Sequence, residues 1–133
     1  MKELMKFFVS LFVFCLAGTT NADTQCALSS SASIESCVAE NFKQADRELN
    51  VVYRQTIDQV VGSYKAAPEL RTELLSKLKS AQIAWIKFRD ANCAVFAFEI
   101  EESKTAYTMA LNQCKTTMTK DRIGQLLNGF PNV

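Results

Sequence analysis

Cysteine is the residue type with the clearest chemistry in this sequence. The chain has five cysteines and no histidine. Cys15 lies in an apolar N-terminal segment, which leaves four cysteines in the rest of the chain. An even number in an exported chain is typical of disulfides, and four cysteines allow three pairings. We expect Cys26–Cys37 and Cys93–Cys114, because each of these bonds closes a short local loop.

The alternative use of four cysteines is a zinc site. Structural zinc ligands usually come as close pairs such as Cys-x2-Cys, and no such pair occurs in this chain. The sequence therefore favours disulfides, and we expect no metal and no cofactor.

Catalytic chemistry finds little support among the other residues. A chain without histidine lacks the usual general base and the usual partner of serine and cysteine nucleophiles. Glu99, Glu101 and Glu102 lie close together, but a carboxyl group needs burial to act as an acid catalyst, and this segment is an expected exposed loop. The cluster is either solvated surface or a docking surface for a basic partner. We assign no catalytic residue and expect a binding protein rather than an enzyme.

The N-terminal segment has the layout of a secretory signal peptide. Lys2 and Lys6 precede an apolar run over residues 7–18, and small residues follow up to Ala22. The run is shorter than the roughly 20 residues that span a bilayer. We predict a signal peptide over residues 1–22 and one domain over residues 23–133. This domain would be periplasmic or secreted, with no membrane span.

The balance of charge argues against nucleic acid as a partner. The chain has 15 basic and 14 acidic residues, and the predicted signal peptide removes Lys2, Glu3 and Lys6. The remainder then carries equal numbers of both signs, whereas a protein that tracks phosphates needs a basic surplus. We expect a protein partner, and the composition favours no oligomeric state.

Hydrophobic periodicity predicts three helices and no strand. Apolar residues recur every three or four positions over roughly residues 33–61 and again from Pro68 for about 30 residues. A third helix is expected over residues 106–128, ended by Gly129 and Pro131. The recurring positions are Ile34, Val38, Phe42, Ala45, Leu49, Val52, Thr56 and Val60 in the first helix, and Leu70, Leu74, Leu78, Ala81, Trp85, Phe88, Asn92 and Val95 in the second.

These elements predict an all-α fold: a small bundle of two long antiparallel helices plus a third helix, stapled by two disulfides. The first two helices are antiparallel because a short turn joins them. One register then pairs Asp46 with Arg89 and places Asn50 and Gln82 close to Trp85. We interpret Asp46 and Arg89 as a pair that fixes the helix register, and Trp85 as a core residue.

Residues 81–93 carry a resemblance to a known family. Their string Ala-Gln-x-x-Trp-x-x-x-Arg-Asp-x-x-Cys resembles the hallmark of the LprI-like domain family, which includes lysozyme inhibitors of the bacterial envelope. Two flanking strings also match, Ala-Asp-x-x-Leu-Asn-x-x-Tyr after Cys37 and Thr-x-x-Arg after Cys114. The resemblance covers roughly residues 26–127. The matching residues, interpreted as structural, include Asp46, Asn50, Tyr53, Gln82, Trp85, Arg89 and Asp90.

The resemblance implies a helical fold, an envelope location, no cofactor and, for some members, inhibition of lysozyme. Where the family often has Gly-Gly-Ser between its last two cysteines, this chain has Glu101-Glu102-Ser103. We predict partner contacts at Glu99, Glu101 and Glu102, with a lysozyme or another cell-wall hydrolase blocked by steric occlusion. The alternatives are an immunity protein against a delivered toxin, and an accessory envelope protein with no enzyme target.

Overall fold

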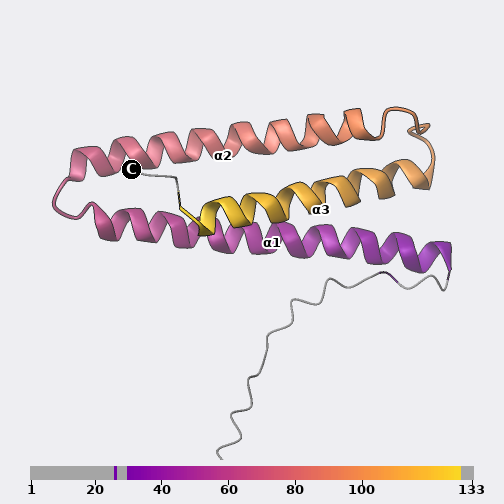
Figure 1. The fold of residues 1–133 in the computed structure, drawn as a ribbon, viewed down its shortest axis with the longest axis horizontal. Coiled ribbons are helices and arrows are strands. Elements are labelled where there is room, and N and C mark those ends of the chain that lie inside the picture. Colours follow the sequence, from indigo (N-terminus) through magenta and orange to yellow (C-terminus); the bar gives the residue numbers. More distant parts are fainter. Residues whose placement is uncertain (1–25, 27–29, 130–133) are drawn as a thin grey trace, which may run out of the picture.

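The computed structural model describes Cys26 and residues 30–129 and contains three helices. They are α1 (Ser31–Ser63), α2 (Pro68–Phe96) and α3 (Thr105–Leu127) (Figure 1). No strand occurs among the described residues. The predicted all-α class is confirmed, and the helix ends lie within two residues of the expected positions. The predicted signal peptide falls outside the described residues.

Local chemistry explains where the helices begin and end. Ser30 Oγ accepts a hydrogen bond from the Ser33 backbone N–H at 3.2 Å, and Ser33 Oγ accepts one from the Ser30 N–H at 3.1 Å. This capping box satisfies donors that the first turn of α1 would otherwise leave free. Pro68 opens α2 with Glu69 beside it, and Gly129, with a φ of 72°, follows the end of α3.

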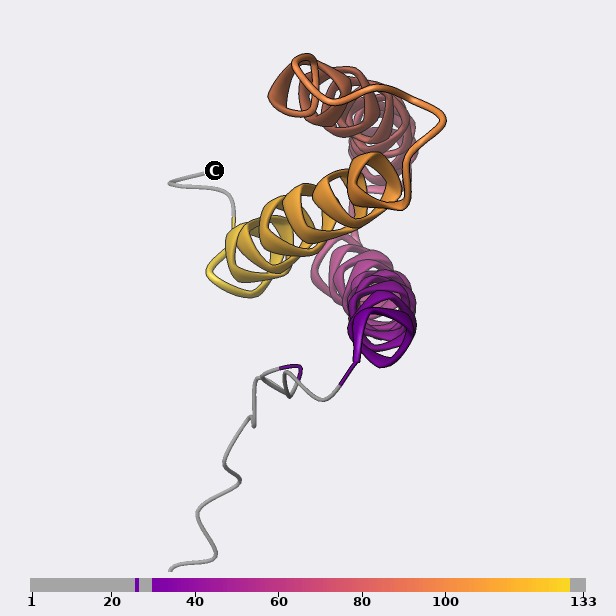
Figure 2. The ribbon, with the colours of Figure 1, turned by 90° about the vertical axis from the view of Figure 1, so that its right-hand side faces the viewer.

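The third helix holds the other two together. α1 and α2 run antiparallel, and α3 lies at a level between them in the end-on view (Figure 2). α1 contacts α3 most extensively, α2 contacts α3 less, and α1 and α2 contact each other least. The predicted antiparallel hairpin of α1 and α2 is therefore present, but each of these helices packs mainly against α3 rather than against the other. None of the helices in the described part of the chain is long and apolar enough to cross a membrane.

The hydrophobic core lies mainly between α1 and α3. Leu49 and Val52 of α1 pack with Ile123 and Leu126 of α3, and each of these residues is at most 6% exposed. The side chains that flank the cluster are Tyr53 and Trp85. The buried residues of α1 all belong to its predicted periodic row: Ala45, Leu49, Val52 and Thr56.

The sequence-based expectation for the buried face of α2 is largely wrong. Most of the apolar stripe that predicts this helix lies on its exposed face. α2 buries Leu78, Gln82, Arg89 and Cys93. Two of these buried side chains, Gln82 and Arg89, are polar, and they can be buried because they form hydrogen bonds with neighbouring helices. A search for apolar periodicity does not find a buried face that contains polar residues. Three members of the predicted stripe are 57, 59 and 75% exposed, namely Leu70, Phe88 and Val95.

Candidate functional site

A buried arginine links all three helices. Arg89 of α2 is 5% exposed. Its Nη1 donates to Asp46 Oδ1 of α1 at 3.1 Å and to Thr119 Oγ1 of α3 at 3.2 Å, and its Nε donates to Asp90 Oδ1 at 3.0 Å. The predicted pair of Asp46 and Arg89 is confirmed. Thr119, which the sequence analysis includes only as the first residue of the Thr-x-x-Arg string, is fully buried.

Aromatic rings and a second cation complete this cluster. The Arg89 guanidinium lies 5.2 Å from the centroid of Phe42 and 5.4 Å from that of Trp85, both within cation–π range. Lys115 Nζ of α3 lies 3.4 Å from Asp90 Oδ1. Every buried side-chain nitrogen and oxygen of the described residues has a partner. The cluster therefore fixes the three helices relative to one another.

A second polar contact joins α2 to α3. Arg122 Nε donates to Gln82 Oε1 at 3.1 Å, and its guanidinium lies 5.7 Å from the Trp85 ring centroid. Burial lowers the pKa of Arg122 from its usual value. Gln82 and Trp85 thus share Arg122 of α3 as a partner, which the predicted register of α1 and α2 did not include. Asn50 is exposed and donates to the Asp46 carbonyl oxygen at 2.9 Å, and its expected place near Trp85 stays a prediction.

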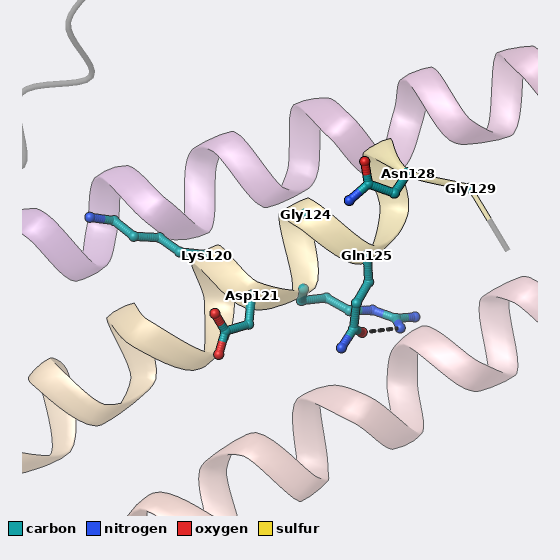
Figure 3. A pocket seen from close by; sticks show the side chains of 7 residues that line it. Lys120, Asp121, Gly124, Gln125, Asn128 and Gly129 are labelled. Carbon is teal, nitrogen blue, oxygen red and sulfur yellow. Dashed lines mark hydrogen bonds between the residues drawn. The ribbon is translucent and has the colours of Figure 1, made fainter. Parts of the chain in front are cut away.

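An open pocket of about 700 Å³ lies along the C-terminal half of α3 (Figure 3). All its lining residues belong to α3 or to the two residues that follow it, so a single helix builds it. Lys120 and Asp121 give it opposite charges, and the Arg122 Nη1 donates to Gln125 Oε1 at 3.1 Å at its edge. In the part of the chain that the structure describes, no group of histidine, cysteine and acidic residues could hold a metal ion.

The disulfides have the predicted pairing. Cys26 is bonded to Cys37 and Cys93 to Cys114, with Cα–Cα distances of 5.7 and 5.6 Å. All four sulfur atoms are used in this way, which removes the zinc alternative. The second bond joins the end of α2 to the middle of α3, so it links the two helices that flank the loop formed by residues 97–104.

This α2–α3 loop carries the predicted acidic cluster at the surface. Glu99, Glu101 and Glu102 are exposed. Glu101 accepts a hydrogen bond from Ser103 Oγ at 2.6 Å and lies 3.6 Å from Lys104 Nζ. Glu99 and Glu102 make no ion pair with another described residue. The expected exposure is thus confirmed, and the role of these carboxylates in binding stays a prediction.

Sequence reasoning missed the aromatic residues beside this loop. Phe96 and Phe98 are 68% and 84% exposed. The available signal was the run Val95-Phe96-Ala97-Phe98, which has more apolar residues than one helix face can bury. The end of α2 therefore presents both apolar and acidic groups to solvent.

Comparisons with known proteins identify a family and two relatives by sequence. The family model described as lysozyme inhibitor LprI matches residues 16–126. The chain is 31% identical over 103 residues to Uncharacterized protein R02472 of Rhizobium meliloti (strain 1021), covering 73% of this chain and 71% of that protein. It is 36% identical over 63 residues to Uncharacterized protein YecT of Escherichia coli (strain K12), covering 45% of this chain and 38% of that protein.

A solved structure has a similar fold. The crystal structure of a DUF1311 family protein from Pseudomonas putida KT2440 matches with a TM-score of 0.69 and 26% sequence identity, covering 77% of this chain and 97% of that one. The family model spans most of the sequence. The chain therefore belongs to the lysozyme inhibitor LprI family.

Proposed function

We propose that this protein is an exported, non-enzymatic binding protein that inhibits a cell-wall hydrolase of the lysozyme type by covering its substrate cleft. The observation that carries the proposal is the exposed acidic α2–α3 loop in a chain of the LprI family. The two disulfides are compatible with an envelope or secreted location.

The charge of the loop suits a basic partner. Glu99 and Glu102 make no ion pair with another described residue, so their charge is available to an incoming protein. Complementary charge speeds the encounter of two proteins and excludes partners of the wrong sign. A hydrolase that presents basic groups around its cleft would be drawn to this end of the bundle.

The loop is also held in shape before any partner arrives. The Cys93–Cys114 disulfide and the ion pair of Asp90 with Lys115 join the two helices that flank the loop, at positions within α2 and α3. Within the loop, the Ile100 N–H donates to the Ala97 carbonyl oxygen and the Lys104 N–H to that of Glu101, both at 3.0 Å. A preorganised loop loses less conformational entropy on binding.

An exposed aromatic ring adds a source of affinity. Phe98, at the start of the loop, is 84% exposed. Aromatic side chains are over-represented among the few interface residues that carry most of the binding free energy. The loop thus combines one apolar anchor with an acidic rim, which is the usual anatomy of a protein-binding patch.

Lysis of peptidoglycan by several lysozyme classes, with and without the oxidised protein, tests this function. We expect dose-dependent inhibition of at least one class. Replacing Glu99, Glu101 and Glu102 together with glutamine should weaken inhibition about tenfold, which is the summed effect of losing three exposed charge interactions. The same change should make inhibition less dependent on salt concentration. A matched control replaces three exposed acidic residues elsewhere, Glu35, Glu48 and Glu69.

The outcomes distinguish whether the protein inhibits a hydrolase from whether the α2–α3 loop makes the contact. Absence of inhibition for every class at high molar excess contradicts the proposed function and favours the immunity or accessory role. Inhibition that the loop variant and the control variant retain equally keeps the function but removes the loop from the contact surface.

A further inference from the structure

Two arginines lie against the ring of Trp85, and they differ in how their charges are balanced. Arg89 lies between the carboxylates of Asp46 and Asp90, at 3.1 and 3.0 Å. Arg122 makes no ion pair with any other residue that the structure describes. The bundle thus holds a second cation whose charge no described carboxylate balances.

The hydrogen bonds of Arg122 leave part of its guanidinium available. Its Nε donates to Gln82 Oε1 and its Nη1 to Gln125 Oε1, both at 3.1 Å. Both acceptors are neutral amides, which accept hydrogen bonds without balancing the charge. Nη2 has no hydrogen bond to a described residue, and it is open to solvent, because every buried side-chain nitrogen of those residues has a partner. This outer edge of the guanidinium can therefore take a ligand.

The surroundings of Arg122 favour the arrival of an anion. Burial lowers the pKa of Arg122 from its usual value, because the charged form loses part of its hydration. A carboxylate next to the guanidinium would stabilise the charged form, since charge-assisted hydrogen bonds are among the strongest that proteins make.

The pocket along the C-terminal half of α3 gives a ligand access to this cation. Arg122 and Gln125 both line it, and its volume is about 700 Å³ (Figure 3). Arg122 lies more than one turn before the end of α3 at Leu127, so the negative end of the helix dipole, which acts over the last turn, has little effect there. The amide side chains of Gln125 and Asn128 can hydrogen-bond to other polar groups of the ligand.

We propose that this pocket binds a carboxylate through Arg122. The carboxylate accepts hydrogen bonds from the outer edge of the guanidinium, in the two-point geometry that arginine favours. The lining has two basic residues, Lys120 and Arg122, against the acidic Asp121. This excess of one positive charge matches a single carboxylate. The carboxylate can belong to a peptide or to a small organic acid, and the test separates these two sources.

Trp85 provides the readout, because it is the one tryptophan of the chain and its ring centroid lies 5.7 Å from the Arg122 guanidinium. Its fluorescence is measured while the oxidised protein is titrated with acetyl-trialanine, which has a free C-terminal carboxylate. We expect a saturable change, and binding at least about tenfold weaker for the C-terminal amide of the same peptide. Acetate is the third probe. Tighter binding of the peptide acid than of acetate identifies a peptide carboxylate, and equal binding identifies a small acid.

Two variants change the charge of the pocket in opposite directions. Arg122→Gln should weaken binding of the peptide acid at least about tenfold. Asp121→Asn should strengthen it a few-fold, because Asp121 is exposed and repels the incoming carboxylate. Glu35→Gln is the control, since Glu35 is an exposed acid near the start of α1. Circular dichroism melts show whether each variant is folded, and Asp121→Asn keeps the test decisive if Arg122→Gln is not.

Three results overturn the proposal. They are no saturable change at millimolar concentrations of the peptide acid, equal binding of the acid and its amide, and an affinity that Asp121→Asn changes no more than Glu35→Gln does. None of these measurements uses a hydrolase, so the carboxylate site and the proposed function stand or fall separately.

Discussion

Asp46 and Arg89 lie 43 positions apart in the sequence, and the Arg89 Nη1 reaches the Asp46 Oδ1 at 3.1 Å. The two partners are unequally buried, because the Arg89 side chain is 6% exposed and the Asp46 side chain 44%. Arg89 also keeps a second carboxylate, Asp90, at 3.0 Å. The contact is thus a buried cation between two half-exposed anions rather than a closed pair.

Removing the cation should therefore cost more than removing one anion. We expect Arg89→Ala to lower the free energy of unfolding by about 3 kcal/mol, because it deletes packing on Phe42 and Trp85 together with three hydrogen bonds. Asp46→Asn should cost only about 1 kcal/mol, because Asp90 still neutralises the charge. Urea unfolding of the oxidised proteins measures both. Equal losses would mean that Asp90 does not compensate for Asp46.

The Cys93–Cys114 disulfide should contribute substantially to the free energy of unfolding. It joins α2 to α3 across 21 positions. The double variant Cys93→Ala with Cys114→Ala should lower the free energy of unfolding by about 3 kcal/mol, mainly because the unfolded chain regains freedom. Thermal unfolding compared with the wild type measures the loss. An unchanged midpoint would show that the α2–α3 contacts hold the loop without the bond.

Two glycines offer a matched pair for a test of backbone freedom. An added Cβ at Gly124, inside α3, meets nothing within 4 Å. Gly124→Ala should therefore stabilise the protein by roughly 0.5–1 kcal/mol. Gly129, with a φ of +72°, also has open space, but Gly129→Ala should destabilise it, because an alanine rarely adopts this conformation. Stabilisation by both variants would contradict this assignment.

The pKa of Glu40, an exposed carboxylate of α1, should respond to the basic residues beside it. The hydrogen bond from Arg47 Nη2, at 2.8 Å, lowers the pKa of Glu40 from its ordinary 4.5, and the charges of Arg47 and Lys43 act in the same direction. Because the folded pKa is lowered, any stability from this contact is present above the ordinary pKa and is lost as the pH falls through the folded value. NMR titration should show a pKa that rises in Arg47→Gln.

Lys43→Gln is the control for this titration. Lys43 Nζ lies 4.0 Å from the Glu40 carboxylate, and its charge is the smallest of the effects that lower this pKa. The pKa of Glu40 should therefore rise less in Lys43→Gln than in Arg47→Gln. The reverse order would mean that the Arg47 hydrogen bond does not form in solution.

The sequence predicted α1 well because that helix has one apolar row. The buried residues Ala45, Leu49, Val52 and Thr56 all belong to it. α2 instead has two candidate rows, and the one that reaches the core contains Gln82 and Arg89. Burial of those two side chains depends on partners in other helices, such as Thr119 and Arg122 of α3. Periodicity within one helix cannot detect partners that lie so far along the chain.

The candidate site shows the same division between local and distant contacts. The disulfide pairing followed from the short spans between cysteines, and the pair of Asp46 with Arg89 followed from one turn and one register. The packing order of the helices did not follow, because no short pattern indicates that α3 would lie between α1 and α2. The sequence analysis did not consider Phe98, and the apolar run that contains it does not show which of its residues the bundle leaves exposed.

The central place of α3 has a consequence for how the chain folds. α1 and α2 are made first, yet they contact each other least, and each depends on α3 for most of its packing. During synthesis the early hairpin has little to hold it closed, so its core-facing side chains stay open to water until the last of the three helices has been made. Formation of the native bundle is therefore a late event that joins distant parts of the chain, and a chain cut before α3 should remain without a stable fold.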